Sequence, residues 1–203
     1  MNPARVALRL ALAGGGLAVL AVHYGQALVE AWLPAYRAVF SWLMDDFDLL
    51  TLALDHEGAD RVVRATVAWK PFFLLDGRVL EMDPRGVGNV STLTAHALQG
   101  PLVMLTAAFA WPAQRYSEYP LRLLLLAPLL AILVLADVPC VLAGELWRTV
   151  LDALAPGTAS PLLAWKSFVH GGGRYVLALV AALAAVRGGR SPTGPSTMPV
   201  PGA

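Results

Sequence analysis

Four residues in the C-terminal half of the chain carry side chains that could do chemistry: Asp137, Cys140, His170 and Arg174. Cys140 follows Asp137 by about one helical turn, and His170 precedes Arg174 by about one turn. A cation beside a thiol favours the thiolate, and an imidazole can act as its base, so this set could run thiolate chemistry. The alternative is structural, because a free cysteine is ordinarily a small buried apolar residue.

Asp137 and Arg174 also predict an intramembrane ion pair. Each lies in an apolar stretch, where a charge costs about 2.5–3.5 kcal/mol on insertion scales. Asp137 is seven residues from Gly144 and Arg174 is seven from Ser167, which is about 10 Å of helix in each case. Because the two stretches run in opposite directions, the charges come to matching depth. We predict that they pair and hold the two helices together.

The stretches that position these residues are long enough to cross a membrane. The chain is 57% hydrophobic and only 14% charged, whereas soluble domains carry about 25% charged residues. A membrane helix needs roughly 20 apolar residues. Four stretches qualify: Leu10–Val29, Leu93–Trp111, Leu123–Leu146 and Ser167–Val186. We interpret the first as a retained signal anchor, because it is too long for a cleaved signal peptide and lacks a cleavage site.

Basic residues near the ends of these stretches predict their orientation. Six fall on one side of a four-span arrangement: Arg5, Arg9, Arg115, Arg122, Arg187 and Arg190. Arg148 and Lys166 fall on the other side. We therefore expect both termini in the cytoplasm and the segment 34–92 outside it. Richness in Ala, Gly, Arg and Pro suggests a GC-rich bacterial gene, which would place the chain in a bacterial inner (plasma) membrane.

The segment 34–92 begins with an amphipathic pattern. Tyr36, Val39, Phe40 and Leu43 recur at the spacing of one helical face. We interpret this stretch as a continuation of the first span, bent at Pro34 and lying at the outer membrane interface. A groove for a partner helix is the alternative.

The rest of this segment has the pattern of β-structure. Val63, Ala65 and Val67 alternate with Arg64 and Thr66. The candidate strands are Leu49–His56, Arg61–Trp69, Phe72–Leu75 and Arg78–Met82, the last two joined by the turn Asp76-Gly77. They predict a three- or four-stranded antiparallel patch of roughly 40 residues, which is too small to be stable alone. It should lean on the membrane, on the interfacial helix or on a partner protein.

Other residue patterns predict packing rather than chemistry. We expect His23 and His96 to be hydrogen-bonded packing residues. The runs Gly14–Gly16 and Gly171–Gly173 should let helices approach closely, or loosen the start of the last span. Asp45 resembles the start of a calcium loop, but the glycine and glutamate that such a loop needs are at the wrong offsets. We expect no metal, no cofactor and no nucleic-acid partner.

The predicted fold is a membrane all-α bundle of about four transmembrane helices with a small antiparallel β-rich extracytoplasmic domain. Its parts are a cytoplasmic N-terminus and signal-anchor helix (1–33), an extracytoplasmic helix and β-rich loop (34–92), a three-helix membrane region (93–190) and a disordered cytoplasmic tail (191–203).

This order of parts resembles that of the small multi-pass membrane proteins that accompany bacterial exosortases, the membrane transpeptidases of C-terminal sorting-signal systems. Within it, VGNVSTLTAHALQGPLVMLTAAFAWP (Val87–Pro112) resembles their return into the membrane. Exosortases themselves use Cys, Arg and His on outward-facing helices. Here Cys140 stands in DVPCVLAG and the chain order is Cys, His, Arg, so a self-sufficient transpeptidase is not expected.

The leading hypothesis is a non-catalytic accessory subunit of an envelope protein-sorting or export complex, in contact with a larger membrane partner. The first alternative is a membrane-embedded thiol enzyme, transpeptidase- or protease-like, using Cys140 with His170 and Arg174. The second alternative is an oligomeric transporter subunit in which Asp137 and Arg174 line a water path.

Overall fold

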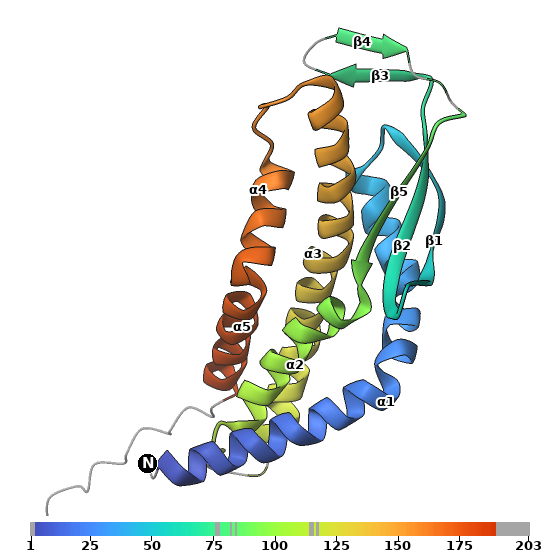
Figure 1. Cartoon of the computed structure of the whole chain (residues 1–203). Helices are drawn as coiled ribbons and strands as arrows, with labels where there is room; N and C mark the ends of the chain where they lie inside the picture. The colour runs from blue at the N-terminus through green and yellow to red at the C-terminus, as the bar shows by residue number, and fades with distance from the viewer. Residues whose placement is uncertain are drawn as a thin grey trace, which may run out of the picture.

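The computed structural model is mostly helical, with a small antiparallel sheet beside one half of the helices (Figure 1). It describes residues 3–75, 78–81, 83, 85–113, 116 and 118–189. In chain order the elements are α1 (Pro3–Leu43), β1 (Phe47–Glu57), β2 (Asp60–Trp69), β3 (Phe72–Leu75), β4 (Arg78–Glu81), β5 (Val87–Leu93), α2 (Thr94–Ala110), α3 (Glu118–Leu154), α4 (Pro161–Phe168), the π-helical turn η1 (Val169–Gly173) and α5 (Arg174–Gly188). The turn Asp76-Gly77, Met82, Arg115, Arg190 and the tail 191–203 lie outside the described residues.

Three helical stretches are long and apolar enough to cross a membrane: Ala4–Leu43, Glu118–Leu154 and Pro161–Gly188. The last one joins α4, η1 and α5 into a single run. The predicted second span corresponds to α2, which has 17 residues and a length of about 25 Å. That is somewhat shorter than a hydrocarbon core of about 30 Å.

Helix α1 continues through Pro34, and its ribbon changes direction partway along (Figure 1). A proline inside a helix removes a hydrogen bond and kinks the preceding turn. After the bend, Tyr36, Phe40 and Met44 are buried in a core shared with the sheet and α3. The amphipathic stripe therefore exists, but its apolar face packs on the chain's own sheet and α3. The predicted position of this stretch at the outer membrane interface stays a prediction, and its apolar face is covered by the sheet and α3.

The sheet contains three antiparallel strands in the order β1-β2-β5. The predicted strands at Leu49–His56 and Arg61–Trp69 correspond to β1 and β2. The other two predicted strands, β3 and β4, form a separate two-stranded hairpin that stands beyond the sheet (Figure 1). The third strand is β5, which the sequence pattern missed because Gly88, Asn89 and Ser91 have low strand propensity.

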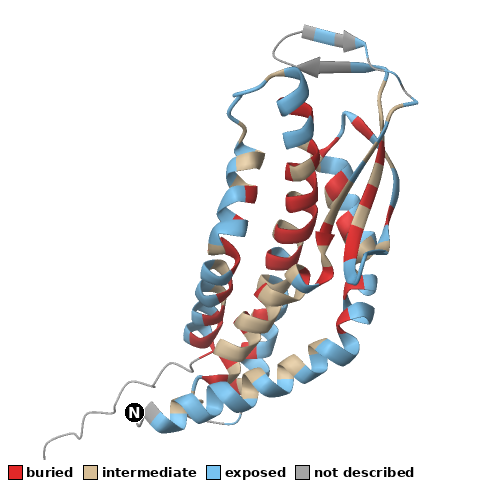
Figure 2. Ribbon diagram, in the orientation of Figure 1, coloured by how far each residue is buried: buried red, intermediate tan, exposed pale blue. Residues whose placement is uncertain are grey.

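The core lies between the sheet, α3 and the second half of α1 (Figure 2). Val63, Ala65 and Val67 are buried in it, as the alternation of β2 predicts. A second apolar cluster joins α2, α3 and α5, with Met104, Leu126 and Ala178 as buried members. By contrast, the first half of α1 is largely exposed within the chain (Figure 2).

Small residues set two close helix contacts. A Cβ placed on Gly25 would lie 2.5 Å from Leu98 Cδ1, and one on Gly14 would lie 3.3 Å from Thr106 Cγ2. The earlier α1 residue, Gly14, contacts the later α2 residue, Thr106, and Gly25 contacts Leu98. The two helices are therefore antiparallel. Of the run Gly14–Gly16, only Gly14 faces another helix.

Candidate functional site

The ion pair between Asp137 and Arg174 is present and buried. Arg174 Nη2 lies 3.2 Å from Asp137 Oδ1, and the two side chains are 7% (Asp137) and 4% (Arg174) exposed. Arg174 Nη1 donates to Gln99 Oε1 at 3.0 Å, and the Tyr175 hydroxyl donates to the same oxygen at 3.0 Å. The pair and Gln99 thus tie together α2, α3 and α5.

Two histidines lie beside this pair. The rings of His96 on α2 and His170 in η1 meet edge to face, with centroids 6.1 Å apart. His96 Nδ1 is buried and has no hydrogen-bond partner among the described residues. His96 was expected to be a hydrogen-bonded packing residue, yet this nitrogen is unsatisfied, which is unusual for a buried polar atom.

The histidines face a small cleft where the sheet meets the helices. Its volume is about 190 Å³, and its polar lining residues are Glu57, Ser91, Thr92, His96, Glu145 and His170. Among the described residues, no group of three or more His, Cys, Asp or Glu is arranged to hold a metal ion. The cleft is therefore a polar junction between the sheet and the bundle.

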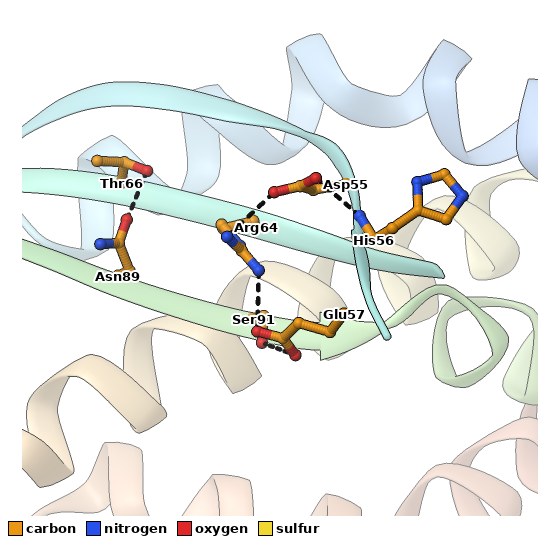
Figure 3. A network of polar contacts seen from close by, with 7 residues as sticks. All are labelled: Asp55, His56, Glu57, Arg64, Thr66, Asn89 and Ser91. Carbon is orange, nitrogen blue, oxygen red and sulfur yellow. Dashed lines mark hydrogen bonds and ion pairs between the residues drawn. The ribbon is translucent and has the colours of Figure 1, made fainter. Parts of the chain in front are cut away.

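On the sheet side, the cleft connects with a surface network of polar side chains (Figure 3). Arg64 contacts Asp55 Oδ2 at 3.1 Å and Glu57 Oε1 at 3.0 Å. Ser91 Oγ donates to Glu57 Oε2 at 3.0 Å. Glu57 therefore links the end of β1 to β2 and β5. Arg64 lies on the face opposite the buried valines, as predicted.

On the helix side, the cleft is closed by an ion pair between α3 and α4. Lys166 Nζ lies 2.7 Å from Glu145 Oε1, and the Lys166 side chain is 9% exposed. A Cβ on Gly144 would lie 2.9 Å from Lys166 Cβ. The absence of a side chain at Gly144 lets α4 come this close to α3.

Cys140 is not part of this cluster. It lines a different cavity of about 520 Å³, together with Trp147 and Trp165. Its Sγ has a long contact of 3.9 Å to the Leu135 carbonyl oxygen. Five residues rotate a helix by about 500°, so Cys140 and Glu145 point about 140° apart around α3. Asp137 and Arg174 thus pair beside His170, whereas Cys140, one helical turn after Asp137, faces a different cavity from the one that His170 lines.

A second buried ion pair lies at the opposite end of the bundle. Arg122 Nη2 lies 3.0 Å from Glu118 Oε2, with side chains 2% and 6% exposed. Arg122 also donates to the carbonyl oxygens of Trp111 at 2.8 Å and Pro112 at 3.2 Å. By its sequence position, Arg122 is expected only to be a basic loop residue that sets orientation. It is in fact buried, where it satisfies carbonyls at the end of α2. The i,i+4 spacing of Glu118 and Arg122 was the available signal.

Fold and site together define a mostly helical protein with three helices able to span a membrane, a three-stranded antiparallel sheet, and a buried polar junction between them. Comparison with known protein families, curated proteins and solved structures gives no match.

Proposed function

We propose that this chain is a non-catalytic accessory subunit of a bacterial envelope protein-sorting or export complex, held against a larger integral membrane protein. The resemblance noted in the sequence favours an exosortase-type transpeptidase as that larger protein. In this proposal the described helices anchor the subunit, and the region beyond the membrane makes the specific contact.

The membrane arrangement belongs to the same proposal. We infer four spans, with α2 as the second, both termini in the cytoplasm, and the sheet and hairpin on the outer side of the inner membrane. Exposed apolar side chains gather on the helices near the N-terminal end of α1, among them Leu12, Val19, Leu124, Ile132 and Val180. Lipid would cover these side chains. The sheet lies at the other end of the molecule (Figure 1).

The observation that carries the accessory role is the hairpin β3–β4. It is paired only within itself among the described strands, and two-stranded hairpins are marginally stable alone in water. The register pairs Phe72 with Glu81 and Leu74 with Val79, so Phe72 and Val79 lie on one face. Both are well exposed, at 70% and 68%. The exposed carboxylate Glu81 lies beside Phe72 on this face, and exposed apolar side chains bordered by polar ones are typical of a docking element.

The test is co-purification of the tagged chain in mild detergent from cells that encode it. We expect a larger multi-pass membrane protein at constant stoichiometry. Phe72→Glu combined with Val79→Glu should remove that protein, because a buried charge without a partner opposes docking. Leu50→Glu is the matched control, since Leu50 is 50% exposed on β1. Equal retention by both variants, or a chain that purifies alone, would contradict the proposal.

The alternatives gain no support from the geometry. A thiol enzyme needs a base and a cation near Cys140, but His170 lines the polar cleft and not the cavity that Cys140 lines. The Arg174 guanidinium is engaged by Asp137 and Gln99. A water path along Asp137 and Arg174 would expose them, but both are buried and paired.

A further inference from the structure

A second groove lies between α1 and the start of α2, beside the turn between β1 and β2. Its volume is about 440 Å³. The lining divides into a polar end, with Gln26, Asp60, Arg61 and Thr94, and an apolar stretch, with Ala18, Ala21, Val22, Leu98 and Leu102. Because α1 and α2 are antiparallel, Gln26 and Thr94 fall at the end nearest the sheet. Gln99 lies between the two leucines, where its oxygen accepts from Arg174 and Tyr175. The groove is therefore amphipathic along its length.

The polar end offers groups that suit an anion. Helix α2 begins at Thr94 and has no side-chain cap, because its N-cap residue is Leu93. Uncapped N–H groups and the helix dipole favour negative charge at this point. Thr94 lines the groove as well.

The same end carries one charge of each sign. Arg61 is fixed by a hydrogen bond from Nη1 to Gln26 Oε1, which leaves its other guanidinium donors for a phosphate. Asp60 is the neighbouring residue and lines the groove as well. A carboxylate opposes a purely anionic headgroup but suits one that also carries an ammonium group.

We propose that this groove binds one phosphatidylethanolamine molecule. Its phosphate lies against Arg61, Thr94 and the start of α2, its ammonium group contacts Asp60, and one acyl chain follows the apolar wall between α1 and α2. The inference rests on the membrane placement proposed above, because an acyl chain reaches this wall only if the wall faces lipid.

The test is native mass spectrometry of the purified, delipidated chain in detergent with equal amounts of phosphatidylethanolamine, phosphatidylglycerol or phosphatidylcholine. Phosphatidylglycerol lacks the cation, and phosphatidylcholine lacks N–H donors. We expect about tenfold stronger retention of phosphatidylethanolamine, the difference typical of one charge-assisted hydrogen bond. Asp60→Asn should abolish that preference, and Arg61→Gln should weaken all three lipids. Arg37 is exposed and lies outside the groove. Arg37→Gln removes the same charge as Arg61→Gln and should leave the retention of all three lipids unchanged.

The apolar wall is tested separately. Ala18→Phe fills the groove and should weaken phosphatidylethanolamine retention, whereas Val19→Phe places the same side chain at a position 59% exposed outside it. Thermal unfolding in detergent checks that each variant is folded.

Equal retention of the three lipids by the unchanged protein would show bulk lipid only and overturn the proposal. Unchanged retention by Arg61→Gln would do so too. In native membranes, a cysteine at position 22 that crosslinks to a protein would identify a partner helix as the occupant instead. The lipid assay uses the chain alone, so its outcome is independent of whether the hairpin binds a partner.

Discussion

At the scale of single residues, burial decides which charges matter. Asp137 and Arg174 satisfy each other inside the helices, and Glu118 and Arg122 do so near the other end of the bundle. Surface pairs such as Arg148 with Asp152, whose side chains are 60% and 69% exposed, contribute little. The Asp137–Arg174 pair links α3 to α5, whereas Glu118 and Arg122 pair within α3 and Arg122 also binds carbonyl oxygens at the end of α2.

Removing one partner of the buried pair should destabilise the protein. Arg174→Met leaves Asp137 as an unpaired buried charge, which typically costs about 3–5 kcal/mol. We expect a marked loss of membrane abundance, measured by quantitative immunoblotting of isolated membranes. Asp137→Leu added to Arg174→Met should restore part of it. Arg148→Met is the control, and abundance unchanged from the parent in Arg174→Met would refute the structural role of the pair.

Cys140 should be dispensable. Its Sγ makes only a long contact with a carbonyl oxygen, so Cys140→Ala removes one half-buried sulfur and should cost about 1 kcal/mol. We expect normal abundance and normal complementation of a strain that lacks the gene. Loss of complementation at full protein level would instead support thiol chemistry.

At the scale of elements, close approach depends on particular glycines. Gly144 allows α4 to lie against α3, and Gly25 allows α2 to lie against α1. In η1, Gly172 has φ +103°, a conformation that side chains rarely adopt. This glycine permits the π-helical turn that carries His170 and begins the run into Arg174. The predicted loosening at Gly171–Gly173 thus takes the form of a kink at Gly172 between α4 and α5.

Gly144→Ala should weaken the α3–α4 contact. The added Cβ would lie 2.9 Å from Lys166 Cβ, so either the helices separate or the Lys166–Glu145 pair lengthens. Overpacking of this kind typically costs about 1–3 kcal/mol. Differential scanning fluorimetry in detergent should show a lower Tm. Gly15→Ala is the matched control, because a Cβ there meets nothing within 4 Å. Equal Tm values for the two variants would contradict the tight contact.

At the scale of the whole molecule, the membrane topology depends on whether α2 crosses the bilayer. If it does, the connection between α2 and α3 lies on the opposite side from the sheet. If α2 does not cross, both lie on the same side. Two exposed positions report on these regions: Val79 on β4, 68% exposed, and Tyr116, 93% exposed.

Single cysteines at these positions, in a Cys140→Ala background, should label from opposite sides of intact inner-membrane preparations. A membrane-impermeant maleimide should reach position 79 from outside in spheroplasts, and position 116 only in inverted vesicles. Protein with cysteine at neither position is the control. Labelling of both positions from the same side would show that α2 does not cross and that the protein has three spans. The C-terminus would then lie on the outer side instead of in the cytoplasm.

The sequence alone determined the features that depend on position along one element. Hydrophobic length located the three helical stretches that can span a membrane, although it also predicted a fourth span at α2, which is shorter. Alternation located β1 and β2, and counting residues from the span ends predicted that Asp137 and Arg174 would meet. These follow from fixed rises per residue and fixed side-chain periods.

Only the tertiary structure decided how the elements face one another. It turned Cys140 away from His170, buried Arg122 beneath the end of α2, and gave the third place in the sheet to β5 instead of the hairpin. It also put Tyr36 and Phe40 against the sheet. A sequence fixes the rotation of a side chain around its own helix, but which neighbour lies there depends on packing among elements distant in the chain.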